Sequence, residues 1–397
     1  MKKKIIISVV LLLLLILSYF LYNYLRIKYA KIEVTLVENL TLEFSEKKHV
    51  SDYITSINGK IIDDYIIDST KLGNKEVAFT FINDDHIKVK YSYIIEVVDT
   101  VEPLIWLGSS YSVPVGSDIH LTDKILCGDN YDNRPNCYIE GNYDLNTVGT
   151  YPLVFKAIDS SGNEESVAFD LNVYQPSNTG KPASPKTTTA YSDIVSKHKN
   201  ETTKIGIDVS SWQGTIDFEK IKNAGVEFIM VRVGGTRGTN GEYFLDKQFK
   251  RNMEEANKYG IDVGVYFYSY SDSLEGAKKD AEWVVEQIKD YKVALPIAFD
   301  WEEWAYFNDY NMSFFGLTNM ADVFLSTIEV AGYQGMLYSS KLYLEKVWLE
   351  TDYDTWLAHY TEQTNYEGPY KIWQLCDNGK VDGIDGFVDI NVMYINN

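Results

Sequence analysis

The sequence predicts a multidomain chain with an N-terminal transmembrane helix, two small all-β sandwiches and a C-terminal α/β barrel of the TIM-like kind. Three observations support this fold class. The run from Ile5 to Leu25 is almost wholly apolar and has about the 20 residues that a membrane span needs. Two later segments repeat with Gly73 aligned to Gly149, an offset of 76 residues. From Lys204 onward, short apolar strands alternate with amphipathic helices.

Residues 1–31 are expected to form a cytoplasmic stub and a membrane anchor. Tyr19, Phe20, Tyr22 and Tyr24 are typical of the aromatic belt at a membrane interface. No small-X-small cleavage site follows the apolar run, which favours an uncleaved signal anchor over a removed signal peptide. The rest of the chain carries no second span and is therefore expected outside the membrane.

Residues 32–98 and 99–174 are expected to form two related β-sandwiches. Alternating apolar residues in 77–81 and 167–173 predict half-buried strands. The 76-residue offset aligns Phe79 with Phe155, Tyr93 with Phe169, Ile95 with Leu171 and Val97 with Val173. Each segment resembles the bacterial immunoglobulin-like modules that space catalytic domains from cell surfaces. The resemblance implies a spacer or a wall-binding module, with a pure spacer favoured.

Cys127 and Cys137 are close enough in sequence for a local disulfide outside the cell, with two free thiols as the alternative. Residues 175–203 are rich in Pro, Ser and Thr and predict an extended linker. The five His residues show no metal-ligand spacing, so no metal site is expected. A formal net charge of −20 argues against a nucleic-acid partner.

Residues 204–397 are expected to form the barrel and to contain the whole site. In such barrels function lies at the C-terminal ends of the strands. One predicted core strand, Leu295–Phe299, leads directly into Asp300 and Glu302. Residues i and i+2 of a strand face the same way, so these two carboxyl groups are expected side by side. One pKa is then raised and the other kept low, which suits glycoside hydrolysis. Trp301 between them is expected in the core.

Other strand ends carry further candidates for a sugar-binding cleft, because aromatic faces stack on sugar rings and carboxylates and amides hold hydroxyl and acetamido groups. Asp208 ends the first strand, and Asp389 lies in a late Val-Asp-Ile-Asn segment. The candidate substrate-binding residues are Tyr266, Tyr268, Trp356, Tyr360, Trp373 and Gln374.

Four segments of the barrel resemble glycoside hydrolase family 25, the Chalaropsis-type lysozymes or N-acetylmuramidases (EC 3.2.1.17). They are Gly206–Gly214, Phe299–Glu302, Trp373–Gln374 and Val388–Asn391, in the family's order. The resemblance implies Glu302 as general acid/base, Asp300 as its partner, and Asp208 and Asp389 as further acids of the cleft. It also implies peptidoglycan as substrate and no cofactor.

Two mechanisms stay open for Asp300: direct attack on the anomeric carbon, or stabilisation of an oxazolinium ion formed by the substrate's own 2-acetamido group. The resemblance favours the second. The expected protein is a single-pass membrane enzyme of a bacterium, expected to be Gram-positive, with its catalytic domain outside the cell. The alternatives are a chitinase-like hexosaminidase and an inactive wall-binding protein.

Overall fold

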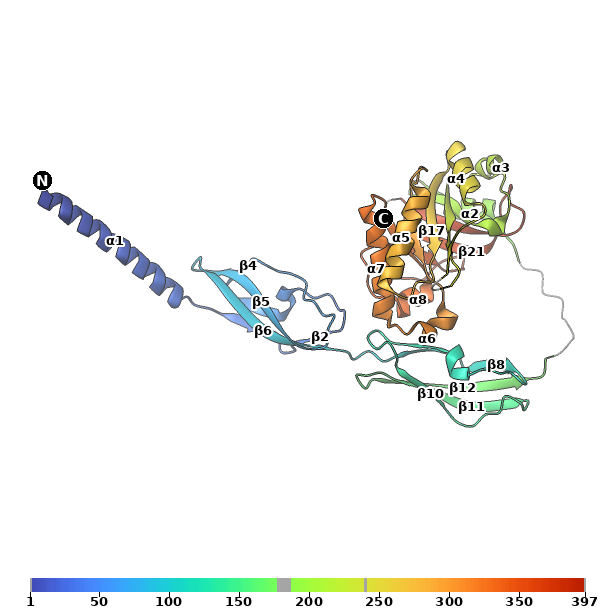
Figure 1. Cartoon of the computed structure of the whole chain (residues 1–397), viewed down its shortest axis with the longest axis horizontal. Coiled ribbons are helices and arrows are strands. Elements are labelled where there is room, and N and C mark those ends of the chain that lie inside the picture. Colours follow the sequence, from blue (N-terminus) through green and yellow to red (C-terminus); the bar gives the residue numbers. More distant parts are fainter. Residues whose placement is uncertain (1, 177–186, 239–240, 396–397) are drawn as a thin grey trace. The chain divides into compact units, whose positions relative to one another are not determined.

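A computed structural model describes residues 2–176, 187–238 and 241–395 of the chain (Figure 1). The chain divides into two compact units, Met1–Thr100 and Val101–Asn397. Each unit is described by itself below.

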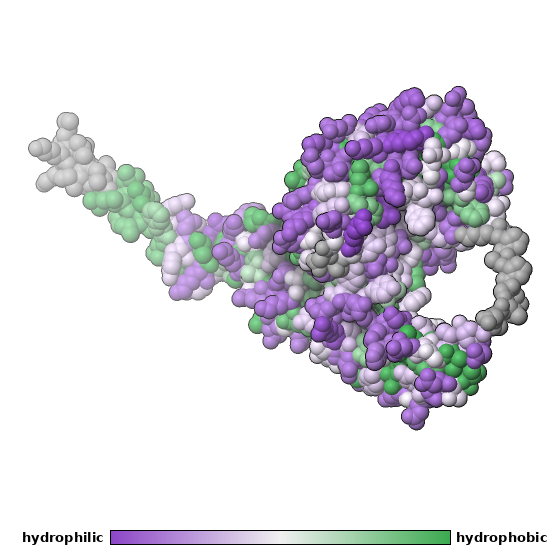
Figure 2. All heavy atoms as spheres, turned by 45° about the vertical axis from the view of Figure 1, so that its right-hand side comes forward, coloured by the Kyte–Doolittle hydropathy of each residue, from purple (hydrophilic) through white to green (hydrophobic). Residues whose placement is uncertain are grey.

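The first unit begins with helix α1 (Lys2–Lys28). Its segment Val10–Lys28 is 19 residues long and apolar enough to cross a membrane. The leucines at positions 11–15 are each 53–66% exposed, so no part of the described protein covers them. Figure 2 shows this apolar surface in green. An uncovered apolar helix of this length fits the predicted membrane span or signal anchor.

The first β-module follows α1. Its strands are β1 (Val34–Leu36), β2 (Thr41–Glu43), β3 (Ile54–Ile57), β4 (Gly59–Ile61), β5 (Gly73–Asn83) and β6 (Lys88–Val98), with a 3-10 turn η1 (Val50–Tyr53). One sheet has the order β2-β6-β5-β4, and β1 pairs with β3. Alternate residues of β5 and β6, among them Phe79 and Ile95, are buried in its core.

The second β-module has the same topology. Its strands are β7 (Leu104–Trp106), β8 (Ser110–Pro114), β9 (Leu126–Gly128), β10 (Asn136–Glu140), β11 (Gly149–Ile158) and β12 (Glu164–Tyr174), with a 3-10 turn η2 (Leu121–Lys124). One sheet has the order β10-β11-β12-β8, and β7 pairs with β9. The register is shared too, because Val77 faces Tyr93 in the first module and Leu153 faces Phe169 in the second, each shifted by 76. The predicted repeat is therefore present in the fold. The immunoglobulin-like class stays a prediction.

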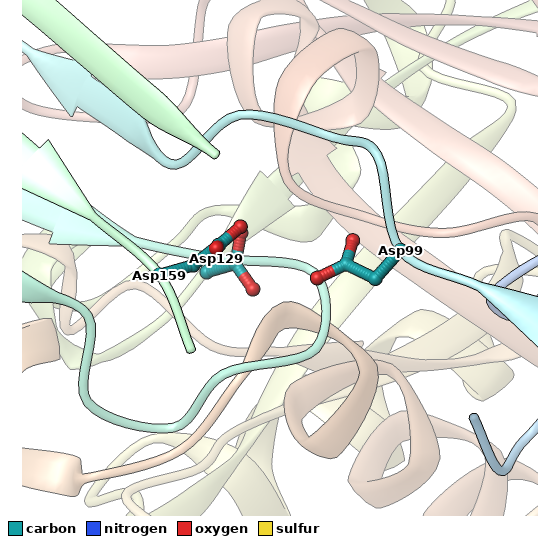
Figure 3. A group of neighbouring side chains, drawn as sticks. All are labelled: Asp99, Asp129 and Asp159. Atoms are coloured by element: carbon teal, nitrogen blue, oxygen red, sulfur yellow. The ribbon is translucent and has the colours of Figure 1, made fainter. Parts of the chain in front are cut away.

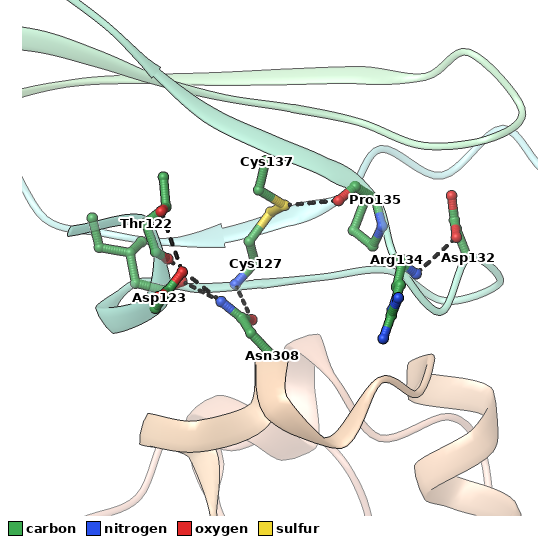
Figure 4. The surroundings of a disulfide bond; sticks show 9 residues. Thr122, Asp123, Cys127, Asp132, Arg134, Pro135, Cys137 and Asn308 are labelled. Carbon is green, nitrogen blue, oxygen red and sulfur yellow. Dashed lines mark hydrogen bonds between the residues drawn. A yellow bond between two sulfur atoms is a disulfide. The ribbon is translucent and has the colours of Figure 1, made fainter. Parts of the chain in front are cut away.

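Cys127 on β9 and Cys137 on β10 form the predicted disulfide, with their Cα atoms 6.5 Å apart (Figure 4). It joins the two-stranded sheet to the four-stranded sheet of the second module. Cys376 is a buried free thiol.

The rest of the second unit is the barrel. Its strands are β13 (Thr189–Ala190), β14 (Thr203–Val209), β15 (Phe228–Thr236), β16 (Tyr243–Leu245), β17 (Asp262–Tyr268), β18 (Ile297–Asp300), β19 (Gly335–Ser340), β20 (Asp354–Ala358), β21 (Ile372–Lys380) and β22 (Val388–Tyr394). Its helices are α2 (Tyr191–His198), α3 (Phe218–Asn223), α4 (Phe249–Lys258), α5 (Leu274–Ile288), α6 (Phe307–Tyr310), α7 (Phe314–Val330) and α8 (Lys341–Lys346), with 3-10 turns η3 (Ser211–Gln213) and η4 (Trp304–Tyr306).

The barrel departs from a regular TIM-like barrel, in which eight parallel strands each precede a helix. The sheet has ten strands; β13 and β16 are additions at its edge, and the other eight close into a ring. The seven ring strands before β22 run parallel, whereas β22 is antiparallel to both β14 and β21. No helix is described between β20 and β21 or between β21 and β22. Gly and Pro in these connections, such as Gly368 and Pro369, disfavour a helix.

The predicted linker 175–203 is shorter than expected. Residues 177–186 lie outside the described part of the chain, but residues 189–198 form β13 and α2. Strand β13 pairs with β21, and Tyr191 and Ile194 of α2 are buried in the barrel core. The hydroxyl of Tyr191 donates to the carbonyl of Ile205, 2.9 Å away. An apolar i, i+3 pair that fits a helix face explains why these residues fold onto the barrel.

The second β-module also packs on the barrel, whereas the prediction that residues 204–397 contain the whole site stays a prediction. Leu126 of β9 belongs to the same buried cluster as Phe307 and Phe314 of the barrel. A Cβ added at Gly128 would lie 2.7 Å from the Phe314 ring and 2.8 Å from the Phe307 ring. Residues 307–314 follow the predicted Asp300–Glu302 pair, so the module supports the segment that leaves the site.

Candidate active site

Four carboxyl groups predicted from the sequence lie at the barrel's strand ends. Asp208 is on β14 and Asp389 is its register partner on β22. Asp300 is the last residue of β18, and Glu302 follows two residues beyond the strand end. Because β14, β18 and β22 belong to one closed ring, residues far apart in sequence meet at one site.

Asp208 is 6% exposed and is held by amide groups. Its Oδ2 accepts hydrogen bonds from Gln374 Nε2 at 2.9 Å and Asn391 Nδ2 at 2.7 Å. It is also hydrogen-bonded to Asp389. Burial raises the pKa of Asp208 from its usual 3.8 to about 6, although these three hydrogen bonds oppose the shift.

The amides around Asp208 are themselves fixed by aromatic residues. The hydroxyls of Tyr338 and Tyr360 donate to Gln374 Oε1 at 2.9 and 3.1 Å. Trp356 Nε1 donates to Asn391 Oδ1 at 2.8 Å. The side-chain oxygens of Gln374 and Asn391 accept these hydrogen bonds, so the NH2 group of each amide is oriented to donate to Asp208. Tyr360 and Gln374 are thus in the site as predicted, Tyr360 with 54% of its surface exposed.

Asp300 and Glu302 form a hydrogen-bonded pair in which Asp300 is the donor. Burial raises the pKa of Asp300 well above its usual range, and the charge of Glu302 raises it further. Burial between the cleft walls also raises the pKa of Glu302, while the hydrogen bond from Asp300 lowers it. Glu302 is exposed to solvent, whereas Asp300 is only 4% exposed. The sequence predicts Glu302 as the proton donor, whereas the deeper burial of Asp300 favours the higher pKa on Asp300. The general-acid role of Glu302 stays a prediction.

One oxygen of Asp300 is free for a ligand. Its Oδ1 is buried and has no hydrogen-bond partner among the described residues. A buried acceptor of this kind costs about 1–3 kcal/mol unless something donates to it. The positive charge of Arg232 on β15 lowers the pKa of both Asp300 and Glu302. It therefore stabilises the ionised form of each carboxyl group.

Glu302 lines a pocket of about 410 Å³. Aromatic rings and polar groups share its wall, as expected of a sugar site. The other lining residues are Trp304, Tyr338, Ser340, Lys341, Leu342, Tyr343, Glu345, Ala358, His359 and Tyr360. Asp300 is not among them and lies behind Glu302.

Tyr266 and Tyr268 lie on β17, beside β18. Burial raises the pKa of Tyr266 well above 10, and the charges of Asp208 and Asp300 add to the shift. The hydroxyl of Tyr268 donates to Glu303 Oε1 at 3.0 Å. Its ring lies under Arg232, 5.3 Å from the guanidinium carbon. Both tyrosines therefore lie near the carboxyl group of Asp300.

Trp356 and Trp373 do not present ring faces to a ligand. They are 2% and 3% exposed, and neither lines the pocket. Trp356 fills the barrel interior, and Trp373 Nε1 donates to the His359 carbonyl at 2.9 Å. Inward-facing positions of a small barrel are filled by side chains, which explains the burial of Trp356. Trp373 belongs instead to the core cluster that includes α2, and its ring contacts His198. Trp301 is fully buried, as predicted, and its Nε1 donates to the Ser271 carbonyl.

Several site residues were missed by the sequence reasoning. Asn391 had a signal, because it lies two residues after Asp389 on one strand and so faces the same side. Trp304 and Tyr343 come from the connections after β18 and β19, whose course no short motif predicts. Arg232 also had a signal, because it is the only charged residue in the apolar strand segment Phe228–Val233.

A separate group of acids lies away from the barrel strands. Asp129 and Asp159 of the second unit are both buried, and one carboxylate oxygen of each lies within 4.8 Å of one of the other; Figure 3 labels both side chains. No short sequence motif joins these two residues, so the sequence did not predict that they lie together.

The raised pKa of Asp208 leads to a testable pH dependence of stability. A buried carboxyl with a folded-state pKa near 6 and an unfolded one near 3.8 favours folding below pH 3.8, and this contribution is lost as pH rises through 6. Asp208→Asn, neutral at every pH, should therefore stabilise the second unit by about 2–3 kcal/mol at pH 8 and hardly at all at pH 4. All eight Trp residues lie after residue 100, so Trp fluorescence in urea reports on this unit. An equal gain at both pH values would contradict the assigned pKa.

Comparisons with known proteins found sequences similar to this part of the chain. Residues 207–384 match the sequence model of glycosyl hydrolases family 25. The uncharacterized protein YegX of Escherichia coli K12 is 29% identical over 192 residues, which is 47% of this chain and 68% of YegX. The autolytic lysozyme of Clostridium acetobutylicum is 24% identical over 189 residues, 47% of this chain and 54% of the lysozyme. The chain thus spans about half of that lysozyme's length.

Solved structures show the same likeness. The modular autolysin LytC of Streptococcus pneumoniae, solved with a synthetic peptidoglycan ligand, is 27% identical, with a TM-score of 0.45 over 61% of this chain and 56% of LytC. A family 25 glycosyl hydrolase of Bacillus anthracis is 24% identical, with a TM-score of 0.44 over 54% of this chain and 96% of that protein. Since relatives also come from E. coli, the expected Gram-positive origin is not supported. Residues 207–384 of the second unit are thus similar to glycosyl hydrolases family 25.

Proposed function

We propose that this protein is a membrane-anchored extracellular lysozyme. It hydrolyses the β-1,4 bond between N-acetylmuramic acid and N-acetylglucosamine in peptidoglycan. The observation that carries the proposal is the hydrogen-bonded Asp300–Glu302 pair, whose outer member lines the pocket of a family 25 domain. Paired carboxyls with raised pKa values are what glycoside hydrolysis requires.

Glu302 is the general acid of the proposed mechanism. It is the member of the pair that faces the pocket, so it can reach the glycosidic oxygen. The proton held on Asp300 must first move across their hydrogen bond. A substrate N–H that donates to the unpartnered Oδ1 would stabilise ionised Asp300, lower its pKa and so transfer the proton to Glu302. Substrate binding then generates the acid.

The same oxygen favours the substrate-assisted route over direct attack. In that route the 2-acetamido oxygen of the substrate attacks the anomeric carbon, and Asp300 holds the acetamido N–H of the oxazolinium ion. A buried, unpartnered acceptor fits this role, and Asp300 lies behind Glu302 rather than on the pocket wall. Two hydrogen-bonded carboxyls leave no room for the water that an inverting enzyme places between them, so the β configuration is retained.

A thiazoline analogue of the oxazolinium ion tests the route. It should inhibit competitively if the acetamido group takes part. A glycosyl ester on Asp300, trapped with a slow fluorinated substrate and found by mass spectrometry, would assign direct attack instead. Either route uses only acid–base and neighbouring-group chemistry, so the proposed reaction requires no cofactor.

Asp208 and Asp389 are proposed to orient the substrate and to add negative potential below the developing positive charge. Their hydrogen bond and the amides of Gln374 and Asn391 fix Asp208 in place. Preorganised groups of this kind stabilise a charged transition state without reorganising during the reaction.

Placement outside the membrane is proposed from α1, whose apolar surface is uncovered. The intact chain should stay in the membrane fraction. A protein released into the medium with a new N-terminus after about residue 25 would show instead a cleaved signal peptide.

Digestion of purified murein sacculi tests the function. The full chain should lower the turbidity of the suspension, and borohydride reduction should convert the new ends to muramitol, as mass spectrometry would show. New glucosaminitol ends, or cleavage of chitin oligomers, would favour the hexosaminidase alternative. Binding without any new reducing ends would mean an inactive wall-binding protein.

A further inference from the structure

We propose that the second β-module forms part of the substrate cleft, with Trp106 as a binding surface for sugar units beyond the catalytic pocket. The ligand class is a long glycan strand of N-acetylated pyranose rings. The inference rests on the proposed function and assigns to this module a role other than that of a spacer.

Three aromatic side chains, Trp304, Tyr343 and Trp106, make up what we call the aromatic platform. The rings of Trp304 and Tyr343 are stacked, with centroids 3.8 Å apart and an interplanar angle of 14°. Both line the pocket together with Glu302. The ring of Trp106 lies next, 6.4 Å from that of Tyr343. The platform therefore begins inside the catalytic pocket and ends on the module.

Trp106 has the exposure that a binding surface needs. It is 45% exposed, although it contacts the barrel through Tyr343. Its register partner across the β7–β9 pair is Leu126, which is buried in the barrel core. Register partners project from the same face of a sheet. Trp106 thus belongs to the face turned to the barrel, at the point where that face reaches solvent.

Hydrogen bonds hold the module in place against the barrel. The side chain of Asn308 in α6 donates to the Ile125 carbonyl at 3.1 Å and accepts from the Cys127 amide at 3.2 Å (Figure 4). The amide of Phe314 donates to the Asp129 carbonyl at 2.7 Å. The amide of Ser313 donates to Asn133 Oδ1 at 2.9 Å. These contacts enclose Leu126 and lie beside the Cys127–Cys137 disulfide.

Such fixing matters because a binding surface that is already positioned does not lose conformational entropy when the ligand arrives. Lys124 adds a further contact, with its Nζ 5.5 Å from the centre of the Tyr306 ring. The barrel side of the interface is the segment that follows Glu302. Trp106 is thereby fixed relative to the acid.

Glycan is the occupant that the chemistry favours. Exposed aromatic faces bind the apolar faces of pyranose rings, and polar neighbours bind the hydroxyls. Here the polar neighbours along the pocket wall are Ser340, Lys341 and Glu345. A strand cut at Glu302 is a polymer and continues past the pocket, so its distal sugars meet the platform.

Kinetics on two substrates tests the inference, with the full chain purified in detergent. The substrates are a tetrasaccharide of alternating N-acetylglucosamine and N-acetylmuramic acid, and long soluble glycan strands. Trp106→Ala should raise KM on the long strands about fivefold to tenfold and leave kcat unchanged, because one stacked ring contributes about 1–1.4 kcal/mol. Kinetics on the tetrasaccharide should not change. Trp106→Phe keeps a ring and should recover most of the loss.

Tyr143→Ala is the matched control, since Tyr143 is an aromatic residue of the same module, 39% exposed, for which the described part of the chain shows no ring contact with the barrel. It should leave both substrates unaffected. An unchanged KM of Trp106→Ala on long strands overturns the inference. An equal loss on both substrates, with a lower Tm, also overturns it, because Trp106 would then only support the barrel. A wild-type chain inactive on both substrates refutes the proposed function itself.

Discussion

Replacing Glu302 by Gln is expected to lower kcat on murein at least about 100-fold, the usual contribution of a positioned general acid. The amide keeps the shape of the side chain at the pocket wall but has no proton of suitable acidity for the leaving oxygen. The fold and the affinity for sacculi should persist, because Glu302 lies after the end of β18 rather than in the packed core. Release of reducing ends and a sedimentation assay with sacculi measure the two quantities separately.

The neighbouring acid supplies the control. Glu303 accepts a hydrogen bond from the Tyr268 hydroxyl and does not line the pocket. Glu303→Gln keeps that acceptor and should retain activity within a few-fold of wild type. If Glu302→Gln kept similar activity, or if Glu303→Gln lost as much, the proton donor would have been assigned to the wrong residue.

Asp300→Asn is expected to reduce activity by about 100-fold or more, since it removes the charge proposed to stabilise the oxazolinium ion. It should also shift the pH profile of the remaining activity. In the wild type, two neighbouring carboxyls share a proton, and repulsion keeps that proton bound to high pH. In the Asp300→Asn variant the neighbouring negative charge is gone, and the NH2 group of the introduced amide can donate to ionised Glu302. Both changes lower the pKa of Glu302.

The falling limb of the pH profile, where the acid loses its proton, should therefore move to lower pH in Asp300→Asn. Asp208→Asn removes a more distant charge and should move the same limb much less. A limb at the wild-type position in Asp300→Asn would refute the electrostatic coupling of the pair. A thiazoline inhibitor that binds Asp300→Asn as tightly as wild type would refute its contact with the acetamido group.

Local sequence patterns predicted most of the barrel's strands, because each is a short apolar run bounded by Gly or a polar turn. Gly225, Gly260 and Gly332 follow the ends of α3, α4 and α7, and all three have positive φ. Strand β22 was recognised only as a Val-Asp-Ile-Asn motif. Its antiparallel direction depends on the pairing with β14 and β21, which no local pattern specifies.

The candidate site was predictable where one strand or one motif supplied the residues. Asp208, Asp300, Glu302 and Asp389 all lie at the strand ends, although their catalytic roles stay a proposal. The order of burial within the Asp300–Glu302 pair was not predictable, because it depends on how the chain turns after β18. Trp356 and Trp373 show the same limit, since a Trp at a strand end can point inward or outward. The packing of the second module on the segment after Glu302 depends on Leu126 and Asn308, which belong to no motif.

Closure of the barrel through β22 has a consequence for the order of events during synthesis. Asp389 and Asn391, which hold Asp208, lie on a strand that the ribosome makes long after β14. A nascent chain that stops before residue 388 has an open ring and lacks two of the three side chains that hold Asp208, so its cleft is incomplete. The two β-modules, by contrast, can fold as soon as each has emerged. A cell that makes this protein therefore produces its β-modules first and the complete site last, so unfinished chains lack the proposed glycan-cleaving activity.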